Sequence, residues 1–333
     1  YKRQHIFNAC LVYLLAYSFI RNHFDSKKAL GISFFTALLF AIHPVQVETV
    51  CWISASKIVL STFFYLSALI CYIQYMRNSK WQYLLASVVS SILAMGCKEQ
   101  SVIIVPCLLL FDWMLFKRNM RSLKVYIEKV YYLIPAIAIF IVTLVANKDT
   151  GEEIIGYTIV DRFIFLCYSV FKYLLISAIP FKLSYLYPFP FQVGEKIPMA
   201  LWIYPFVILF IGYVIYLNRK KPLLVFCTLF FILHLLPVLH VIPLPRYVVV
   251  ADRYLYIPYI AFAIGLSILS YHLYERQRKW ILYAGFLYCS YLCVYTASYA
   301  PAWKNSDTLK EHFKEVLKKR ETNLSINFKH EKQ

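Results

Sequence analysis

Three short segments of this 333-residue chain gather acidic, basic and aromatic side chains within a few positions of one another. They are HPVQVE at 43–48, CKE at 97–99 and ADRYLY at 251–256. A guanidinium presents a fixed fork of donors that matches two phosphate oxygens, and a carboxylate can orient such a cation or accept a proton from a hydroxyl. These residue types predict chemistry on a phosphate-bearing substrate.

The predicted roles divide between cations and carboxylates. Arg253 and Lys98 are predicted to bind the substrate phosphate, and Asp252 to orient Arg253. Glu48 is flanked by valines, so it needs a cationic partner, for which Lys57 or Lys98 is available. We predict no metal ligands and no cofactor. The catalytic candidates are Glu48, Glu99 and Asp252, and the supporting residues are His43, Lys57, Tyr254 and Tyr256.

Each segment also has a purely structural interpretation. HPVQVE suits an ordinary interfacial loop with an aromatic anchor at Trp52. Solvation of a turn explains Lys98 and Glu99, and Asp252 and Arg253 could merely tie neighbouring loops together. No P-loop, Rossmann, zincin or nucleophile-elbow pattern occurs in the sequence. The evidence for chemistry is that these segments are expected on one side of a membrane.

The elements that must position these residues are membrane spans. The chain is 61% hydrophobic and only 16% charged, which is too apolar for a soluble domain of this length. We predict an all-α fold, a polytopic transmembrane helical bundle with about ten spans. The spans are expected at residues 6–22, 30–45, 58–76, 82–97, 101–116, 131–147, 199–217, 222–243, 257–275 and 280–299.

Basic residues cluster in three loops, at 117–129, 219–221 and 276–279. The positive-inside rule places these loops in the cytoplasm and the three polar segments on the opposite face. The net charge of +18 therefore indicates contact with membrane lipids rather than with nucleic acid. The nine cysteines show no metal-ligand or disulfide spacing.

The apolar stretch at 163–181 carries Lys172 at its centre, where an isolated charge at the bilayer midplane costs at least about 2.5 kcal/mol. If this stretch crossed the membrane, the basic loop at 219–221 would face away from the one at 117–129. We therefore predict one re-entrant or interfacial helix here.

We expect two regions, a multi-span membrane domain at 1–299 and an external amphipathic tail at 300–333. Leu309, Phe313, Val316 and Leu317 recur at helical spacing in the tail. The chain begins at Tyr1 rather than Met, and we expect further residues upstream.

The polar segments also carry a resemblance, in both order and spacing, over nearly the whole chain. The chain resembles the membrane domain of the transmembrane and tetratricopeptide-repeat protein family, which is related to protein O-mannosyltransferases of the GT-C fold. The motifs that carry the resemblance are HPVQVETVCWISASK, YIQY, CKEQSVIIVPCLLLFDW, ADRYLYIP and AWKNSDTLKEHF. His43, Glu48, Lys98, Glu99, Asp252, Arg253 and Tyr254 match family positions.

The resemblance implies a GT-C-type glycosyltransferase that moves a mannose-like sugar from a polyprenyl-phosphate donor to a hydroxyl of a protein or glycan outside the cytoplasm. It implies a catalytic carboxylate in an external loop upstream of Tyr1, and a repeat array from about Trp303. The bacterial inner membrane is the favoured location, or the endoplasmic reticulum membrane in a eukaryote. The alternatives are a non-enzymatic transporter and a scaffold that presents a repeat domain.

Overall fold

The computed structural model describes residues 2–146, 156–184, 187–239, 248–311 and 314. In these residues the expectation of an all-α fold is confirmed, because every extended element is a helix and the only strand-like pairing is a bridge between Tyr187 and Val250. The α-helices are α1 (Lys2–Ile20), α2 (Ser26–Ile42), α3 (Val47–Cys51), α4 (Ser56–Asn78), α5 (Trp81–Cys97), α6 (Ile104–Met114), α7 (Leu123–Ile127), α8 (Val130–Ala146), α9 (Ile159–Ala178), α10 (Ile203–Leu217), α11 (Pro222–Leu235), α12 (Pro258–Arg276) and α13 (Arg278–Tyr299).

Each expected span coincides with a helix, but the helices differ in length. Three described segments are long and apolar enough to cross a membrane: Ile53–Asn78, Met199–Leu217 and Arg278–Trp303. Ser26–Ile42 and Pro44–Cys51 pass that test together, bent by 52°. The helices α5, α8 and α11 are apolar but shorter. The 14 residues of α11 extend over only about 21 Å, whereas the hydrocarbon layer of a membrane is about 30 Å thick.

Two of the three long segments are almost completely uncovered by the rest of the described chain. Only 6% of the most apolar stretch of Met199–Leu217, and of that of Arg278–Trp303, is buried within the chain. A water-soluble protein does not leave whole apolar helices uncovered, whereas a lipid layer covers them. The described helices therefore suggest a membrane protein.

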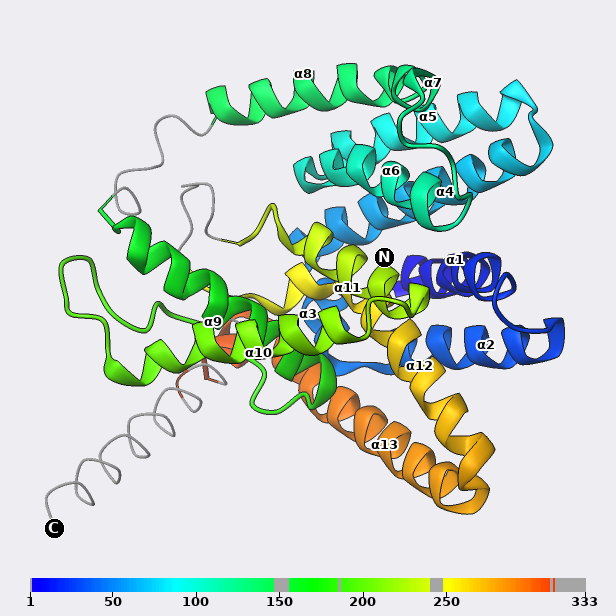
Figure 1. Cartoon of the computed structure of the whole chain (residues 1–333). Helices are drawn as coiled ribbons and strands as arrows, with labels where there is room; N and C mark the ends of the chain where they lie inside the picture. Colours follow the sequence, from blue (N-terminus) through cyan, green and yellow to red (C-terminus); the bar gives the residue numbers. More distant parts are fainter. Residues whose placement is uncertain (1, 147–155, 185–186, 240–247, 312–313, 315–333) are drawn as a thin grey trace, which may run out of the picture.

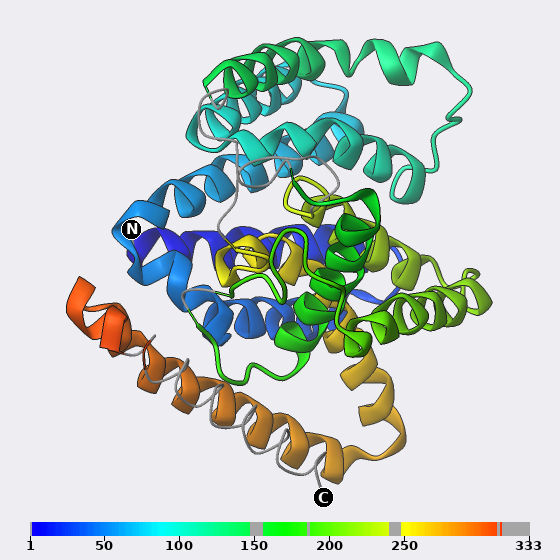
Figure 2. The same cartoon turned by 90° about the vertical axis from the view of Figure 1, so that its left-hand side faces the viewer.

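The helices form a layered bundle. α1 packs against α2 and α4, α4 against α5, and α12 against both α2 and α11. Figure 2 shows the segment from α4 to α8 stacked on one side of α1 and α2, with α13 along the opposite edge. Buried aromatic side chains fill the interior, and Phe19 of α1 stacks on Phe226 of α11 with ring centroids 3.9 Å apart.

The three basic loops lie at one end of this bundle, because Arg118 contacts Met76 near the end of α4, and Phe226, near the start of α11, stacks on Phe19 near the end of α1. Arg77, at the end of α4, donates a hydrogen bond to the carbonyl of Ser18, near the end of α1. Lys28, at the start of α2, pairs with Glu275 at the end of α12, with the two charged atoms 3.1 Å apart. The ends of α1 and α4 therefore meet, as do the start of α2 and the end of α12.

A buried charge cluster closes this basic end. Asp112 of α6 pairs with Lys129, whose ammonium lies 2.6 Å from a carboxylate oxygen, and accepts a hydrogen bond of 2.6 Å from Tyr72 of α4. Arg118 pairs with Glu128 over 2.5 Å. The cluster links α4, α6 and the start of α8, and two basic residues of the 117–129 loop, Arg118 and Lys129, are ion-paired within it.

The helix α9 occupies the stretch for which a re-entrant or interfacial course is predicted. It starts at a capping box formed by Thr158 and Asp161, and it packs against α10. Ser169 donates a hydrogen bond to the carbonyl of Val249, and Tyr173 accepts one from the amide of Ala251. These bonds tie the middle of α9 to the segment that carries Asp252. Its course relative to the bilayer stays a prediction.

The expected boundary at residue 300 falls inside a continuous helical stretch. The end of α13 passes directly into the 3-10 helix η8 (Ala300–Trp303). Trp303 is buried, with its ring 6.0 Å from that of Trp52. Of the predicted tail helix, residues 312–313 and 315–333 lie outside the described residues, so its full extent stays a prediction.

Candidate functional site

A buried ion pair joins two of the three polar segments. Glu48 lies in α3, which follows the 3-10 helix η1 (Pro44–Gln46), and its side chain is completely buried. Its carboxylate contacts Nη1 of Arg253 over 2.5 Å and accepts the backbone N–H of Arg253 over 2.8 Å. The partner of Glu48 is therefore Arg253, and the expectation of Lys57 or Lys98 is wrong.

Two aromatic rings hold the guanidinium of Arg253. Its central carbon lies 5.4 Å from the ring centre of Trp52 and 5.0 Å from that of Tyr254. Cation–π contacts and the carboxylate of Glu48 together fix the side chain, 19% of which stays exposed. Arg253 is thus a preorganised cation with part of its surface accessible.

Lys98 and Arg253 line one narrow pocket of about 30 Å³. Its wall includes the hydroxyl-bearing side chains of Ser61, Tyr65 and Tyr256. This volume holds one or two water molecules but not a sugar phosphate. The structure therefore brings together the two cations assigned to the substrate phosphate, around a pocket that must widen before a donor enters.

Glu99 lies beside Lys98 and is 43% exposed. The two side chains form an ion pair at the start of the 3-10 helix η3 (Glu99–Ile103). Burial opposes ionisation of Glu99, but the ammonium groups of Lys98 and Lys57 outweigh it and hold the pKa of the carboxyl below its ordinary value. Lys57, itself exposed, therefore acts on Glu99 and not on Glu48.

The sequence predicts that Asp252 orients Arg253, and this prediction is wrong. Its buried carboxyl accepts a hydrogen bond of 2.9 Å from Tyr187, and its other oxygen has no hydrogen-bond partner among the described residues. Burial raises the pKa of Asp252 well above its ordinary value, and the nearby charge of Glu48 raises it further. Burial therefore favours the neutral form of Asp252, and Glu48 is the residue that positions Arg253.

The raised pKa of Asp252 predicts how stability depends on pH. The unfolded chain releases this proton near its ordinary pKa of about 3.9, whereas the folded chain keeps it to higher pH. The stabilisation is therefore present under acidic conditions and is lost as the pH rises towards the folded-state pKa. Because asparagine has no proton to release, Asp252→Asn should flatten this decline.

The test is thermal unfolding of wild type and Asp252→Asn in detergent, at a series of pH values from mildly acidic to mildly alkaline. We expect the Tm of the wild type to fall more steeply with pH than that of the variant. The exposed Asp307→Asn is the matched control. Parallel curves for wild type and Asp252→Asn would mean that Asp252 is already ionised in the folded chain.

The supporting residues have packing and capping roles. His43 ends α2, accepts the backbone N–H of Val45 on Nδ1 over 3.3 Å, and packs in a tilted arrangement on Tyr259 with ring centres 4.2 Å apart. The hydroxyl of Tyr256 forms a 2.7 Å hydrogen bond with Nδ1 of His5. These contacts fix the ends of α1, α2 and α12 beside the Glu48–Arg253 pair.

Tyr187 and His5 belong to the site, although neither appears among the residues predicted for it. Tyr187 lies in the aromatic segment KLSYLYPFPFQ, whose composition equally suits a membrane-surface belt. His5 and Asn8 are buried polar residues in the first apolar helix, and Asn8 donates a 2.9 Å hydrogen bond to the carbonyl of Val59. Polar residues in an apolar helix are the one sequence signal that points to such contacts.

Among the described residues, no group of three or more His, Cys, Asp or Glu side chains could hold a metal ion. No family model, curated protein or solved structure matches the chain. Assignment to a family therefore rests on the sequence motifs, and any activity rests on the geometry of the residues around Arg253.

Proposed function

We propose that this chain is the membrane domain of a GT-C-type glycosyltransferase, resembling the O-mannosyltransferases, which uses a lipid-phosphate-linked sugar and a hydroxyl acceptor on the non-cytoplasmic side. The observation that carries the proposal is the placement of Arg253. It is fixed by Glu48, partly exposed, and shares a pocket with Lys98. Preorganised cations of this kind stabilise the charge that develops on a departing phosphate.

The proposed reaction transfers the sugar to the acceptor oxygen. That oxygen forms a bond with the anomeric carbon, while the bond to the phosphate oxygen breaks and the lipid phosphate leaves with the electron pair. Arg253 and Lys98 bind this phosphate, and Glu48 keeps Arg253 in position. Glu48 and Asp252 are buried, so neither meets an acceptor from solution. Among the candidate carboxylates, Glu99 is partly exposed and can take the acceptor's proton.

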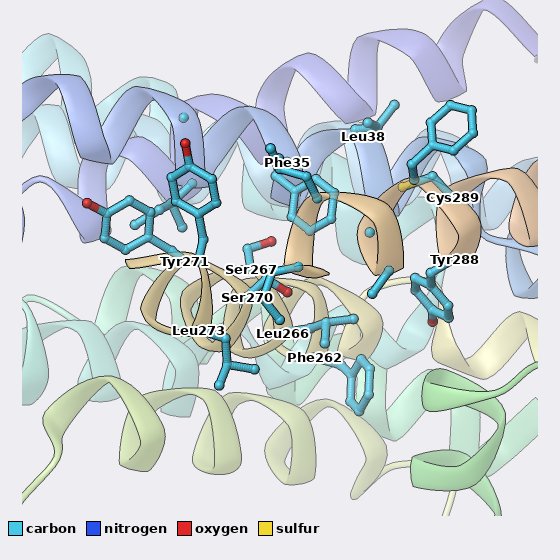
Figure 3. Close-up of a pocket in the computed structure, with 18 of the residues that line it drawn as sticks. Phe35, Leu38, Phe262, Leu266, Ser267, Ser270, Tyr271, Leu273, Tyr288 and Cys289 are labelled. Atoms are coloured by element: carbon cyan, nitrogen blue, oxygen red, sulfur yellow. The ribbon is translucent and has the colours of Figure 1, made fainter. Parts of the chain in front are cut away.

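An apolar groove supports a lipid-borne donor. It has a volume of about 640 Å³ and lies between α2, α12 and α13, with Ala178 of α9 also in its wall. Figure 3 shows Phe35, Leu266 and Tyr288 on three sides of this groove. The ring of Phe262, in the wall, packs on Tyr259, which in turn packs on His43. We propose that the groove holds the isoprenoid chain and directs the phosphate towards the loop that contains Glu48.

A side chain that fills the groove should exclude the isoprenoid chain of the donor. Gly285 lines the groove, and a Cβ built there has open space around it, so the side chain of Gly285→Leu extends into the groove. We expect photo-cross-linking of a polyprenyl-phosphate sugar, with a diazirine on its chain, to fall by at least about fivefold, a loss of about 1 kcal/mol in binding.

Gly212→Leu is the matched control, because Gly212 also has open space at its Cβ position but lies in α10, away from the groove. It should leave cross-linking unchanged. Equal cross-linking of the wild type and Gly285→Leu would remove the groove from the proposal.

One observation favours the alternative of a scaffold without chemistry. The pocket between Lys98 and Arg253 is narrow, as expected if Arg253 serves only to tie α3 to the 3-10 helix η7 (Asp252–Leu255). Arg253→Lys distinguishes the two functions. A scaffold should tolerate the variant, because lysine keeps the positive charge that pairs with Glu48. A glycosyltransferase should lose activity, because lysine lacks the two-point donor that binds phosphate.

A further inference from the structure

A further pocket, larger than the narrow one between Lys98 and Arg253, lies beside the Glu48–Arg253 pair. It has a volume of about 710 Å³ and is formed where the start of α1 and the end of α3 meet the end of α13 and η8. Trp52 belongs both to this pocket and to the aromatic pair around Arg253. The residues that carry the argument are Trp52, Trp303, Lys2, Lys304, Asn305 and Ser306.

The wall of this pocket combines cationic, aromatic and neutral polar groups. Lys2 and Lys304 are exposed and supply two ammonium groups, and none of the described residues that line the pocket is acidic. Asn305 and Ser306 add an amide and a hydroxyl. An anion is therefore favoured over a neutral or cationic ligand.

The aromatic part of the wall narrows the ligand class further. The half-buried indole of Trp52 presents an apolar surface, which the C–H face of a pyranose ring can cover. An amide and a hydroxyl at the rim suit the hydroxyls of a sugar. A volume of about 710 Å³ lies within the range of small-molecule sites, unlike the narrow pocket at Lys98.

We propose that this pocket binds a sugar that carries an acidic group, with the acid at Lys2 and Lys304 and the ring against Trp52. If the chain is a glycosyltransferase, this sugar is part of the acceptor, since Trp52 separates the pocket from Arg253. That role rests on the proposed function, whereas binding itself does not.

Cys51 lines the pocket and supplies a native reporter. The experiment alkylates the full chain in neutral-lipid nanodiscs and follows each cysteine separately by peptide mass spectrometry. Methyl β-glucuronide and methyl β-glucoside are the probes, since they differ only in the carboxylate. Alkylation of Cys51 should slow by about fourfold once the glucuronide exceeds its Kd by about threefold, because only the empty quarter of the protein reacts.

Controls separate this site from other causes of protection. The glucoside should not protect Cys51, and alkylation of Cys97, which lies outside this pocket, should not change with either probe. Lys304→Glu and Lys2→Glu should each abolish protection by the glucuronide. The matched variant Lys196→Glu, at an exposed lysine that does not line the pocket, should retain it.

Three results would overturn the proposal: equal protection by the glucoside, protection that survives either Lys304→Glu or Lys2→Glu, or no protection by the glucuronide. Failure of the glucuronide to protect Cys51 would overturn the proposal even if inorganic phosphate or added anionic lipid protected it, because the ligand would then be a different anion. Arg253→Lys should leave protection unchanged. Protection without any sugar transfer would therefore contradict the proposed function and leave this site intact.

Discussion

Replacing Glu48 by alanine should lower the free energy of unfolding by about 3 kcal/mol, the lower end of the range for breaking a buried ion pair from one side. The carboxylate is completely buried and satisfies both Nη1 and the backbone N–H of Arg253. Its removal leaves these two donors without their acceptor and the positive charge of Arg253 without its carboxylate. The lower end applies because 19% of the Arg253 side chain remains exposed.

The control is the double variant Glu48→Ala/Arg253→Met, which removes both charges and keeps an apolar side chain between the rings. It should recover more than half of the lost stability, since most of the cost comes from the unpaired cation. Unfolding of the solubilised chain by heat and by denaturing detergent measures both variants. If Glu48→Ala matched the exposed Glu195→Ala, the pair would contribute nothing to stability.

The positions of the helices could be predicted from the sequence because long apolar runs separated by charged loops leave few alternatives in a membrane. Their exact ends could not. The sequence extends the span at 222–243 through Pro237, but α11 ends at Leu235, because Pro237 has no backbone N–H with which to continue the helical hydrogen bonds. The span expected from 101 begins as η3, and α6 starts only at Ile104.

The residue types of the site were also predictable, but their pairing was not. Asp252 and Arg253 are adjacent in sequence, which suggests that they interact. In a 3-10 helix, however, successive side chains point about 120° apart, so Asp252 faces Tyr187 while Arg253 faces Glu48. A contact between residues 205 positions apart depends on how α3 packs against η7, and no local pattern records it.

Arg253→Lys should reduce sugar transfer by at least about tenfold, which corresponds to about 1.4 kcal/mol of transition-state stabilisation. Lysine keeps the charge that Glu48 needs, so the variant should fold and insert normally. Lysine lacks the planar guanidinium, which can bind two phosphate oxygens while its Nη1 contacts Glu48. The effect should appear in kcat more than in KM, because the charge on the phosphate grows as the sugar leaves.

The matched control is Arg219→Lys, in a basic loop at the opposite end of the bundle. The decisive measurement uses purified full-length protein, wild type and Arg253→Lys, in vesicles that contain a polyprenyl-phosphate sugar, and records the initial rate of transfer to a hydroxyl acceptor. The account predicts transfer by the wild type and by Arg219→Lys, and a rate at least about tenfold lower for Arg253→Lys at equal protein levels. Equal rates in all three proteins, or no transfer by the wild type, would contradict it.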